Sequence, residues 1–553
     1  MMRFLFLLFI LNLFTFNIWA QDSSYYWISF KYKGNNAYSL SDPIAYLSPK
    51  AIERRTLYNI AFDSLDLPVN PDYINTIQSM GALVVKRSKW LNGIVITNVS
   101  PSILTAIYNL PYVQSGMRIS PRLAGRDHGK SGFRKEDLEL NLSHAPLDYG
   151  LAYNQIQLIK GDCLHELGYR GEGMTIALLD GGFYNVDVMD AFDSLFTHKQ
   201  IKGVFDFVDM DTIVYDYASA HGTYVLSCMA AYIPGVMIGT APKADYYLLR
   251  TENTSSEYII EEYNWALGAE YADSVGADII NSSLGYTTFD DTSHNHTYAD
   301  MNGNTAPSTR AADIAASRGI LVVNSAGNSG NNSWYYIGAP ADGDSVLTVG
   351  AIDSLGMMAS FSSYGPTYDG DVKPNACAKG KNVIVAYTGG GVTYSNGTSF
   401  ASPILCGVAA CLWQSARSKN NIEILHAIEK SAHTYSTPTT HGGYGIPDFC
   451  QAYYKFQNVI DASIWQNLTE PIVFPNPFTT DIIILYEATY DSEGGYALFD
   501  AKGKYLAEKK LKFHKDYIYQ IPIETLNDKA DGVYFIHFDV GDKKYILKTI
   551  KGK

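Results

Sequence analysis

The chain has 553 residues, 46% of them hydrophobic, which is enough for one large core and smaller domains of about 100 to 200 residues each. Its 42 basic and 56 acidic side chains give a formal net charge of −14 at pH 7. Because nucleic acids and anionic membranes attract basic surfaces, this balance argues against both, and we expect no nucleic-acid partner.

The first 20 residues have the pattern of an export signal. Arg3 precedes an apolar run that ends at Ala20, and this run is too short for a stable membrane span. We predict a signal peptide over residues 1–20 and a mature protein that is exported, then released or held at the cell surface. An uncleaved anchor is the alternative, although Asn12 and Asn17 interrupt the apolar run.

Residues 21–122 are predicted to form a small α+β domain. Their apolar patterns follow the order strand, helix, two strands, helix, strand, which is typical of the ferredoxin-like unit. Residues 123–150 come next, and the stretch at 120–139 that leads into them is charged, with many Lys, Arg and Gly residues but few apolar ones. We expect this stretch to be an exposed linker that a protease can cut.

Short apolar runs alternate with helical patterns over residues 151–465. The runs lie at residues 174–180, 244–250, 277–285, 319–328 and 345–353. In the helix predicted at 256–275, the apolar residues share one face: Ile259, Tyr263, Ala266 and Leu267. Runs this apolar, separated by helices, are typical of a parallel sheet covered on both faces. We therefore predict an α/β domain whose chemistry lies beyond the carboxyl ends of its strands.

Residues 470–553 are predicted to form a small β-sandwich. They contain short strands of alternating polarity, entered at Pro475 and Pro477. Lysines crowd the end of this segment from Lys543 to Lys553, as expected for a solvated edge strand that resists pairing.

The six cysteines lie between residues 163 and 450. An exported chain permits disulfide bonds, but the sequence alone does not show which cysteines pair. Cys228, Cys406 and Cys411 lie in apolar helical patterns, where cysteine usually serves as a small buried hydrophobe. We therefore assign no bridge, and no spacing of Cys or His suggests a zinc site.

Three polar residues at the ends of predicted elements suit nucleophilic catalysis. Asp180 closes the run at 174–180, His221 opens the helical sequence HGTYVLSCMAAY, and Ser399 opens the helix within YSNGTSFASPILCGVAACLW. A serine hydroxyl is too weakly acidic to attack an amide unaided, so it needs a histidine to take its proton. That histidine needs a buried carboxylate, which fixes its tautomer and supports the imidazolium.

The same segments supply donors for a developing oxyanion. Asn328 lies on the glycine-flanked turn NSAGNSG, from which its amide can point into a cleft. Ser399 at a helix N-terminus adds free backbone N–H groups. Gly397 lets the backbone bend, and Pro403 is expected in the first helical turn, which has no intrahelical use for its missing N–H.

The order Asp, His, Ser along the chain, without a Gly-x-Ser-x-Gly elbow, argues against an α/β-hydrolase. The motifs ALLDGGF, HGTYV and NGTSFASP instead resemble the aspartate, histidine and serine blocks of the subtilisin-like serine peptidases. SAGNSG resembles the segment of their oxyanion asparagine, and NSSLG resembles the strand that pairs with the substrate backbone. This resemblance implies substrate binding by Ser283, Leu284, Gly285, Ala326 and Gly327.

The resemblance implies an exported serine endopeptidase that cuts polypeptides through an acyl-enzyme. In that interpretation Asp180 orients His221, His221 acts as general base and then as general acid, and Ser399 is the nucleophile. Asn328 and the Ser399 N–H stabilise the oxyanion. The implied fold is a subtilisin-like parallel sheet sandwiched by helices.

The flanking domains extend the resemblance. Residues 21–122 resemble the propeptide that such peptidases carry, which implies an intramolecular inhibitor and an autoprocessed precursor. FPNPF, FDAKGKYL and GVYFIHF, within residues 470–553, resemble the sorting domain of the type IX secretion system of Gram-negative bacteria. That resemblance implies passage across the outer membrane, with the secretion machinery as a partner.

Three departures from the family pattern lie outside the triad. Gly181 replaces a serine or threonine, Tyr224 replaces a common second histidine, and Tyr286 replaces a small residue and is expected to narrow the substrate cleft. A catalytically silent surface or adhesive protein on the same scaffold is the alternative function, since fold does not fix function.

We expect no cofactor and no metal ligand among these site residues. The loop DMNGN, Asp300 to Asn304, has oxygen ligands at alternate positions like a calcium loop, which leaves calcium open there. It lacks the later glutamate expected of an EF-hand.

Overall fold

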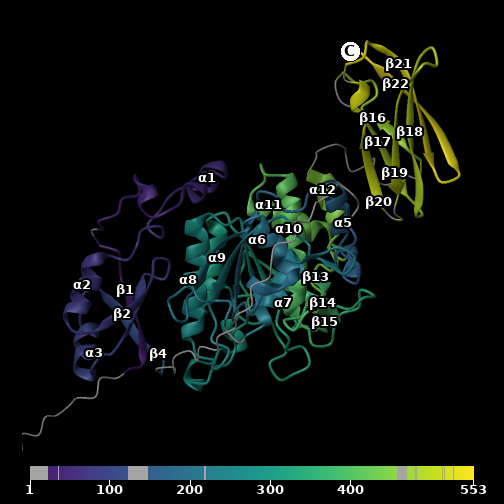
Figure 1. Ribbon diagram of the computed structural model, residues 1–553. Helices are drawn as coiled ribbons and strands as arrows, with labels where there is room; N and C mark the ends of the chain where they lie inside the picture. The colour runs from purple at the N-terminus through teal and green to yellow at the C-terminus, as the bar shows by residue number, and fades with distance from the viewer. Residues whose placement is uncertain are drawn as a thin grey trace, which may run out of the picture.

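The computed structural model describes residues 23–34, 36–121, 147–216, 219–456, 470–479, 482–513, 515, 517–526 and 528–552. The predicted signal peptide at 1–20 and most of the predicted linker at 123–150 lie outside these ranges. Within them, no helix has both the length and the apolarity to cross a bilayer. Figure 1 shows an N-terminal, a central and a C-terminal unit in chain order.

The N-terminal unit has the ferredoxin-like order of elements, in a four-stranded antiparallel sheet ordered β2-β3-β1-β4. Its elements are β1 (Tyr25–Phe30), α1 (Pro49–Leu57), α2 (Pro71–Ser79), β2 (Leu83–Ser88), β3 (Gly93–Thr97), α3 (Pro101–Tyr108) and β4 (Val113–Ser120). Each helix begins at a proline, whose missing N–H costs nothing there, after a capping side chain from Ser48, Asn70 or Ser100. Helix α1 was not predicted.

The central unit is built on a seven-stranded sheet in the order β13-β12-β11-β10-β5-β9-β6. All its strand pairs are parallel, as the apolar runs predict. The strands are β5 (Thr175–Asp180), β6 (Ile201–Asp206), β9 (Asp245–Arg250), β10 (Ile279–Ser282), β11 (Leu321–Ser325), β12 (Val346–Ile352) and β13 (Ala376–Lys379). From β5, the chain adds strands β9 and β6 on one side and strands β10 to β13 on the other, so the direction of strand addition reverses at β5. Open parallel sheets bind ligands beyond the carboxyl ends of the strands at such a reversal.

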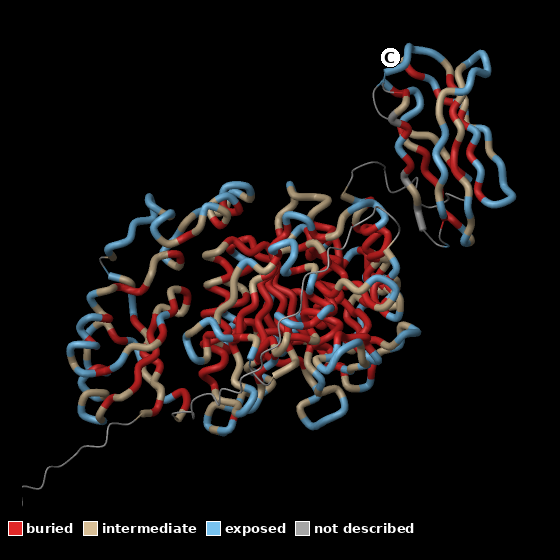
Figure 2. Tube along the Cα trace, viewed as in Figure 1, coloured by how far each residue is buried: buried red, intermediate tan, exposed pale blue. Residues whose placement is uncertain are grey.

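Helices cover both faces of this sheet, as Figure 1 shows. On one face lie α7 (His221–Ala230) and α10 (Thr398–Ser415), and on the other lie α8 (Ile260–Val275) and α9 (Pro307–Ser317). Each face therefore has its own apolar core, and Figure 2 shows buried residues concentrated in this unit. Shorter elements complete it: α4 (Tyr153–Gln157), α5 (Gly161–Glu166), α6 (Asp193–Thr197), β7 (Tyr232–Ile233), β8 (Met237–Ile238), β14 (Val383–Ala386), β15 (Val392–Ser395), α11 (Asn421–Ser431) and α12 (Phe449–Phe456).

Helix α8 is buried on both of its sides. The sequence predicts one apolar face over 256–275, but the helix begins at Ile260 and nearly all of its residues are buried. The N-terminal domain covers the outer side, where the rings of Trp27 and Tyr263 lie 4.5 Å apart and Trp90 joins the same core. A one-sided apolar pattern therefore underestimates the burial of a helix that a second domain covers.

An ion cluster joins these two domains at Asp273 of α8. Asp273 is fully buried and pairs with Arg54 at 2.6 Å, Arg55 at 2.9 Å and Lys89 at 3.0 Å. Burial alone would raise the pKa of Asp273, but the three cations outweigh it and hold the pKa at about 2. All three cations come from the N-terminal domain, so this carboxylate holds the two domains together.

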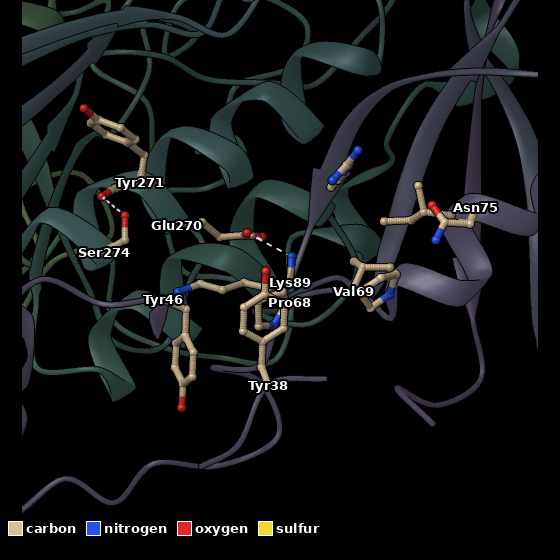
Figure 3. A pocket seen from close by; sticks show the side chains of 12 residues that line it. Tyr38, Tyr46, Pro68, Val69, Asn75, Lys89, Glu270, Tyr271 and Ser274 are labelled. Carbon is tan, nitrogen blue, oxygen red and sulfur yellow. Dashed lines mark hydrogen bonds between the residues drawn. The ribbon is translucent and has the colours of Figure 1, made fainter. Parts of the chain in front are cut away.

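A cavity of about 320 Å³ opens beside the same interface (Figure 3). Glu270 of α8 lies at its wall and accepts hydrogen bonds from Ser88 Oγ at 2.5 Å and from the N–H groups of Lys89 and Trp90 at 2.9 and 3.1 Å. The walls come from both domains, away from the strand ends that carry the predicted catalytic residues.

The C-terminal unit is a small β-sandwich, as predicted. One sheet has the order β16-β17-β20 and the other the order β19-β18-β21-β22. The strands are β16 (Ile472–Phe474), β17 (Ile483–Ala488), β18 (Ser492–Asp500), β19 (Tyr505–Phe513), β20 (Tyr517–Pro522), β21 (Gly532–Val540) and β22 (Lys543–Lys551). Inward-facing residues such as Leu498, Ile536 and Phe538 form its apolar core.

A disulfide bond joins Cys163 of α5 to Cys450 of α12. The sequence alone left this pairing unassigned, because only folding brings together two cysteines that lie 287 positions apart. The remaining cysteines are buried thiols: Cys228, Cys377, Cys406 and Cys411. This confirms the interpretation of the helical cysteines as small buried hydrophobes.

Candidate active site

The carboxyl end of β5 carries Asp180, and α7 begins beside it at His221. Asp180 is fully buried, and its Oδ1 accepts a 2.8 Å hydrogen bond from His221 Nδ1 and a 2.7 Å bond from the Gly181 N–H. Gly222 lets the start of α7 pack closely against the turn that follows β5, because a Cβ at this position would lie only 2.4 Å from the Gly182 carbonyl oxygen. The bond assigns the ring proton to Nδ1, which leaves Nε2 to accept a proton.

The pKa of His221 is raised to about 9. Burial lowers it, but the charge and hydrogen bond of Asp180, together with the charge of Glu252, outweigh burial. A carboxylate in this position stabilises the imidazolium that forms when the ring takes a proton. The pair is therefore suited to general base catalysis.

Ser399 lies in the first turn of α10 and is 8% exposed. Its Oγ lies 3.4 Å from the carbonyl oxygen of Ser283. Among the described residues no hydrogen bond joins Ser399 Oγ to His221, but the ring centroid of Phe400, the next residue, lies 6.0 Å from that of His221. The start of α10, which carries Ser399, thus lies beside the imidazole, and hydrogen bonds between catalytic groups often form only when substrate is bound.

Pro403 lies in the second turn of α10, so its expected place in the first turn is wrong. In a regular helix, the N–H of residue 403 would bond to the carbonyl of Ser399. Proline has no N–H, and the Ser399 carbonyl instead accepts a 2.8 Å bond from Ser283 Oγ. The proline therefore leaves the backbone of Ser399 able to bind the segment that follows β10.

Asn328 follows β11, and the start of α10 holds its side chain. Its Oδ1 accepts hydrogen bonds from the Thr398 N–H at 2.9 Å and from Thr398 Oγ1 at 3.0 Å. Because these bonds identify Oδ1 as the acceptor, the other amide atom is Nδ2, which is a hydrogen-bond donor. The position that a Cβ would occupy at Gly397 lies 3.6 Å from both Asn328 Nδ2 and the Ser399 N, so the two donors border the same small space. Two donors therefore converge at the N-terminus of α10, where the helix dipole favours negative charge.

The predicted substrate-binding residues lie at two neighbouring strand ends. Ser283 and Leu284 after β10 are 6% and 4% exposed, whereas Gly285 is exposed. Ala326 after β11 is buried, and Gly327 turns the chain beside it with a φ of 99°. Because β10 and β11 are paired, the structure brings the five residues together. Their role in substrate binding stays a prediction.

The three departures from the family pattern take distinct positions. A Cβ at Gly181 would lie 2.7 Å from Thr254 Cγ2, so a side chain there would require Thr254 to move. Tyr224 is partly buried against the core of α7 and α10. Tyr286 is fully buried, so its ring packs inside the protein and the expected narrowing of the cleft is wrong.

In the loop at 300–304, side-chain oxygens accept hydrogen bonds from neighbouring residues of the chain. Asp300 Oδ2 accepts bonds from the Thr297 N–H and Oγ1, both at 2.7 Å. Asn302 Oδ1 accepts bonds from the N–H groups of Asn304 at 3.0 Å and Thr305 at 3.1 Å. These bonds close a local turn, and calcium binding there stays a prediction.

A group of acidic residues near the end of β9 was not predicted. It consists of Glu252, Glu257 and Glu261, whose carboxylates converge in the structure. The first two lie in the loop after β9 and the third in the first turn of α8, so no single periodic pattern joins them. The signal available in the sequence was the four-residue spacing of Glu257 and Glu261, which places two side chains close together when the segment is helical.

Three family descriptions match separate parts of the chain. The subtilase family, peptidase S8, matches residues 171–448, which include all four predicted catalytic residues. The peptidase S8 propeptide domain of Bacteroidota matches residues 25–132. The secretion system C-terminal sorting domain matches residues 472–552.

Named relatives are similar to the central part of the chain. Subtilisin NAT of Bacillus subtilis subsp. natto and Subtilisin E of Bacillus subtilis (strain 168) are both 32% identical to it over 294 residues. Each match covers 53% of this chain and 68% of the relative. The solved structure of the self-cleaved protease domain of PatA is 26% identical, with a TM-score of 0.41 over 52% of this chain and 98% of that one.

Proposed function

The chain belongs to the subtilase family and is a serine-type peptidase, and from this premise we propose that it is an exported endopeptidase made as a self-processed precursor. The observation that carries the proposal is the 2.8 Å hydrogen bond between His221 and Asp180, at the sheet edge near which Ser399 lies. The fold, a parallel sheet between two layers of helices, is that of the family. The proposed substrates are the peptide bonds of proteins.

In the proposed mechanism, Ser399 Oγ attacks the carbonyl carbon of the scissile peptide while His221 Nε2 takes its proton. The tetrahedral intermediate collapses as the imidazolium gives that proton to the leaving amine and the C–N bond breaks. This leaves an acyl group on Ser399. A water molecule then attacks the acyl carbon with His221 again as base, which releases the acid product and restores the serine.

Asp180 and Asn328 support these steps without forming bonds to the substrate carbon. Asp180 holds His221 in the tautomer whose Nε2 takes the proton. The Asn328 amide and the Ser399 N–H are the proposed oxyanion donors, because both converge at the N-terminus of α10. Loss of one such donor costs about 10²- to 10³-fold in kcat, a figure known from subtilisin.

We also propose that the N-terminal domain is an intramolecular inhibitor. It matches the propeptide domain of the family, and it covers α8 through the buried ion pairs of Asp273. The segment at 123–150 follows β4, and its charged, glycine-containing sequence suits it as the cleavage site.

The C-terminal β-sandwich is a sorting domain, so this is a secreted or cell-surface protein. We propose that a signal peptide at residues 1–20 directs the first export step. The type IX secretion machinery is the proposed partner that recognises the sandwich and carries the chain across the outer membrane.

Self-processing tests the proposed activity without any assumption about substrates. The chain lacking residues 1–20 is prepared with its native sequence and as Ser399→Ala, and intact masses are followed over time. We expect the native chain alone to lose about a hundred N-terminal residues through a cut between Arg118 and Gly150, because it alone has the nucleophile.

A fluorophosphonate probe separates the remaining outcomes of this experiment. If both chains stay full length and the probe labels them equally, the protein is a catalytically silent surface protein on a peptidase scaffold. Labelling of the native chain without processing would mean that another protease matures an active enzyme.

Peptidase activity is expected to rise with pH. His221 acts as a base only when neutral, so kcat/KM grows as the pH passes its pKa. Against the effect of burial, Asp180 and Glu252 raise that pKa to about 9, while the 36% exposure of the side chain lets solvent screen these charges. We therefore expect an inflection between the ordinary histidine pKa of about 6.5 and about 9.

The variant Asp180→Asn checks the cause of this pH dependence. Loss of the carboxylate should move the inflection in the pH profile of kcat/KM to lower pH, because the imidazolium loses its strongest support. An inflection that stays in place would show that Asp180 does not set the pKa of the base.

A further inference from the structure

Glu252, Glu257 and Glu261 converge between β9 and α8, and we call them the glutamate cluster. One carboxylate oxygen from each lies within 4.8 Å of the others. Glu261 is fully buried, and its carboxylate faces the backbone N–H groups of Asn253 and Tyr258 but forms no ion pair with any described residue. A buried carboxylate without a cationic partner is costly unless a bound cation or a proton neutralises it.

A side chain from another segment faces the same place. Tyr286 is fully buried, and its hydroxyl finds no hydrogen-bond partner in the part of the chain that the structure describes. The charges that act on it most strongly are those of Glu252, Glu261 and Glu257, in that order. One bound group would satisfy both this hydroxyl and the carboxylates.

No ion pair reaches the glutamate cluster from any described residue. The two cations that act on Glu252 are His221 and Arg250. His221 already bonds to Asp180, and Arg250 pairs with Asp206 at 2.7 Å and with Asp209 at 2.9 Å. The nearby acidic groups, Asp180, Glu262 and Asp290, add to the negative charge.

Burial and this crowding of charge both disfavour ionisation of the cluster. Glu261 is fully buried and the three carboxylate oxygens lie within 4.8 Å of one another, so ionised carboxylates here repel one another with little screening by water. The chain itself therefore supplies too little positive charge at this position.

We infer that the glutamate cluster binds a calcium ion. Two ligands that each lie about 2.4 Å from one calcium ion are at most about 4.8 Å apart, and the three carboxylate oxygens meet this limit. Calcium prefers hard carboxylate oxygens and accepts irregular sets of six to eight ligands, whereas magnesium requires a near-octahedral shell. Water molecules on the ion can fill the remaining positions, and the Tyr286 hydroxyl is placed to hydrogen-bond to one of them.

Calcium at this position would tie the start of α8 to the rim of the active site. A Cβ at Gly181, the residue after Asp180, would lie 3.5 Å from Glu252 Oε2. Tyr286 directly follows the predicted substrate-binding segment 283–285. The ion would therefore fix the backbone around the active site, a structural role that does not depend on the proposed hydrolysis.

The test uses the precursor with Ser399→Ala, so that neither processing nor self-digestion changes the sample. The unfolding temperature of its peptidase domain is measured by calorimetry in EDTA, in calcium and in magnesium. Exported calcium sites commonly have dissociation constants of about 0.1 to 1 mM, so calcium at about 10 mM should raise this temperature by about 3 to 8 °C. Magnesium at the same concentration should raise it much less.

The variant Glu261→Gln, made on the same parent, should act in opposite directions with and without calcium. In EDTA it should unfold at the parent's temperature or above, because it removes a buried charge that no described cation neutralises. In calcium it should lose most of the upward shift. Asp300→Asn is the matched control, since its loop is the other calcium candidate, and it should keep the full shift.

The inference is overturned if calcium does not shift the parent, if the shift persists in Glu261→Gln, or if it disappears in Asp300→Asn. An equal shift with magnesium would overturn the assignment to calcium. Because Ser399→Ala removes hydrolysis from the experiment, none of these outcomes bears on the proposed peptidase activity.

Discussion

Replacing Ser399 with alanine is expected to lower kcat by about a millionfold, the loss that the corresponding substitution causes in subtilisin. His221→Ala should cost about as much, because the serine cannot attack without a base and the base has no use without the serine. The double variant should lose no more than either single variant, since the two residues act as one unit.

Ser402→Ala is the matched control for these variants. Ser402 lies on the same helix, where its Oγ bonds to Asn281 Oδ1 at 3.0 Å, and its loss should change kcat by less than about tenfold. Each variant is freed of its N-terminal domain by an unrelated protease, which is then inhibited, and hydrolysis of a peptide substrate is measured. Losses that multiply in the double variant would place Ser399 and His221 in separate steps.

Replacing Asp273 with asparagine is expected to weaken binding of the cut N-terminal domain by roughly 10²- to 10⁴-fold, because breaking a buried ion pair costs about 3–5 kcal/mol. Arg54 and Arg55 would stay buried in the complex without their carboxylate. The inhibition constant of the cut domain against the processed enzyme measures the effect. kcat should not change, because the ion-pair partners of Asp273 all lie in the N-terminal domain.

Asp63→Asn is the control at the same interface. Asp63 pairs with Arg318 at 2.8 Å, but its side chain is 50% exposed, so its loss should cost at most about 1 kcal/mol. Equal effects of the two variants would show that burial does not set the strength of this interface.

The pH dependence of the complex offers a second check on Asp273. Its pKa is lowered to about 2, so its contribution is fully present above the ordinary value of 3.8 and is lost as the pH falls through about 2. We therefore expect the cut domain to stay bound in mild acid in the native protein.

The parts of the fold that could be predicted follow from local patterns. Unbroken apolar runs are typical of strands buried on both faces, so β5 and β10 were found directly. Chemistry in parallel sheets lies at the carboxyl ends of strands, and Asp180 stands at such an end. The candidate catalytic residues could therefore be predicted because each lies at or near the end of a regular element.

The parts that were missed depend on contacts between segments far apart in the chain. The burial of the outer side of α8 requires the N-terminal domain, which no local pattern in that helix contains. Glu252, Glu261 and Tyr286 meet only once β9, α8 and β10 are in place. Pro403 was assigned to the wrong turn because a helix start cannot be located to within one turn from sequence alone.

The bond between Cys163 and Cys450 closes a covalent ring that contains Asp180, His221 and Ser399. Molecules of a peptidase encounter one another, and exposed loop tips are the usual sites of nicking. A single cut inside the ring opens it but releases no fragment, because the two pieces remain joined through the sulfur atoms. A nicked molecule would therefore keep its halves aligned, and a reductant would be needed as well before they could diffuse apart.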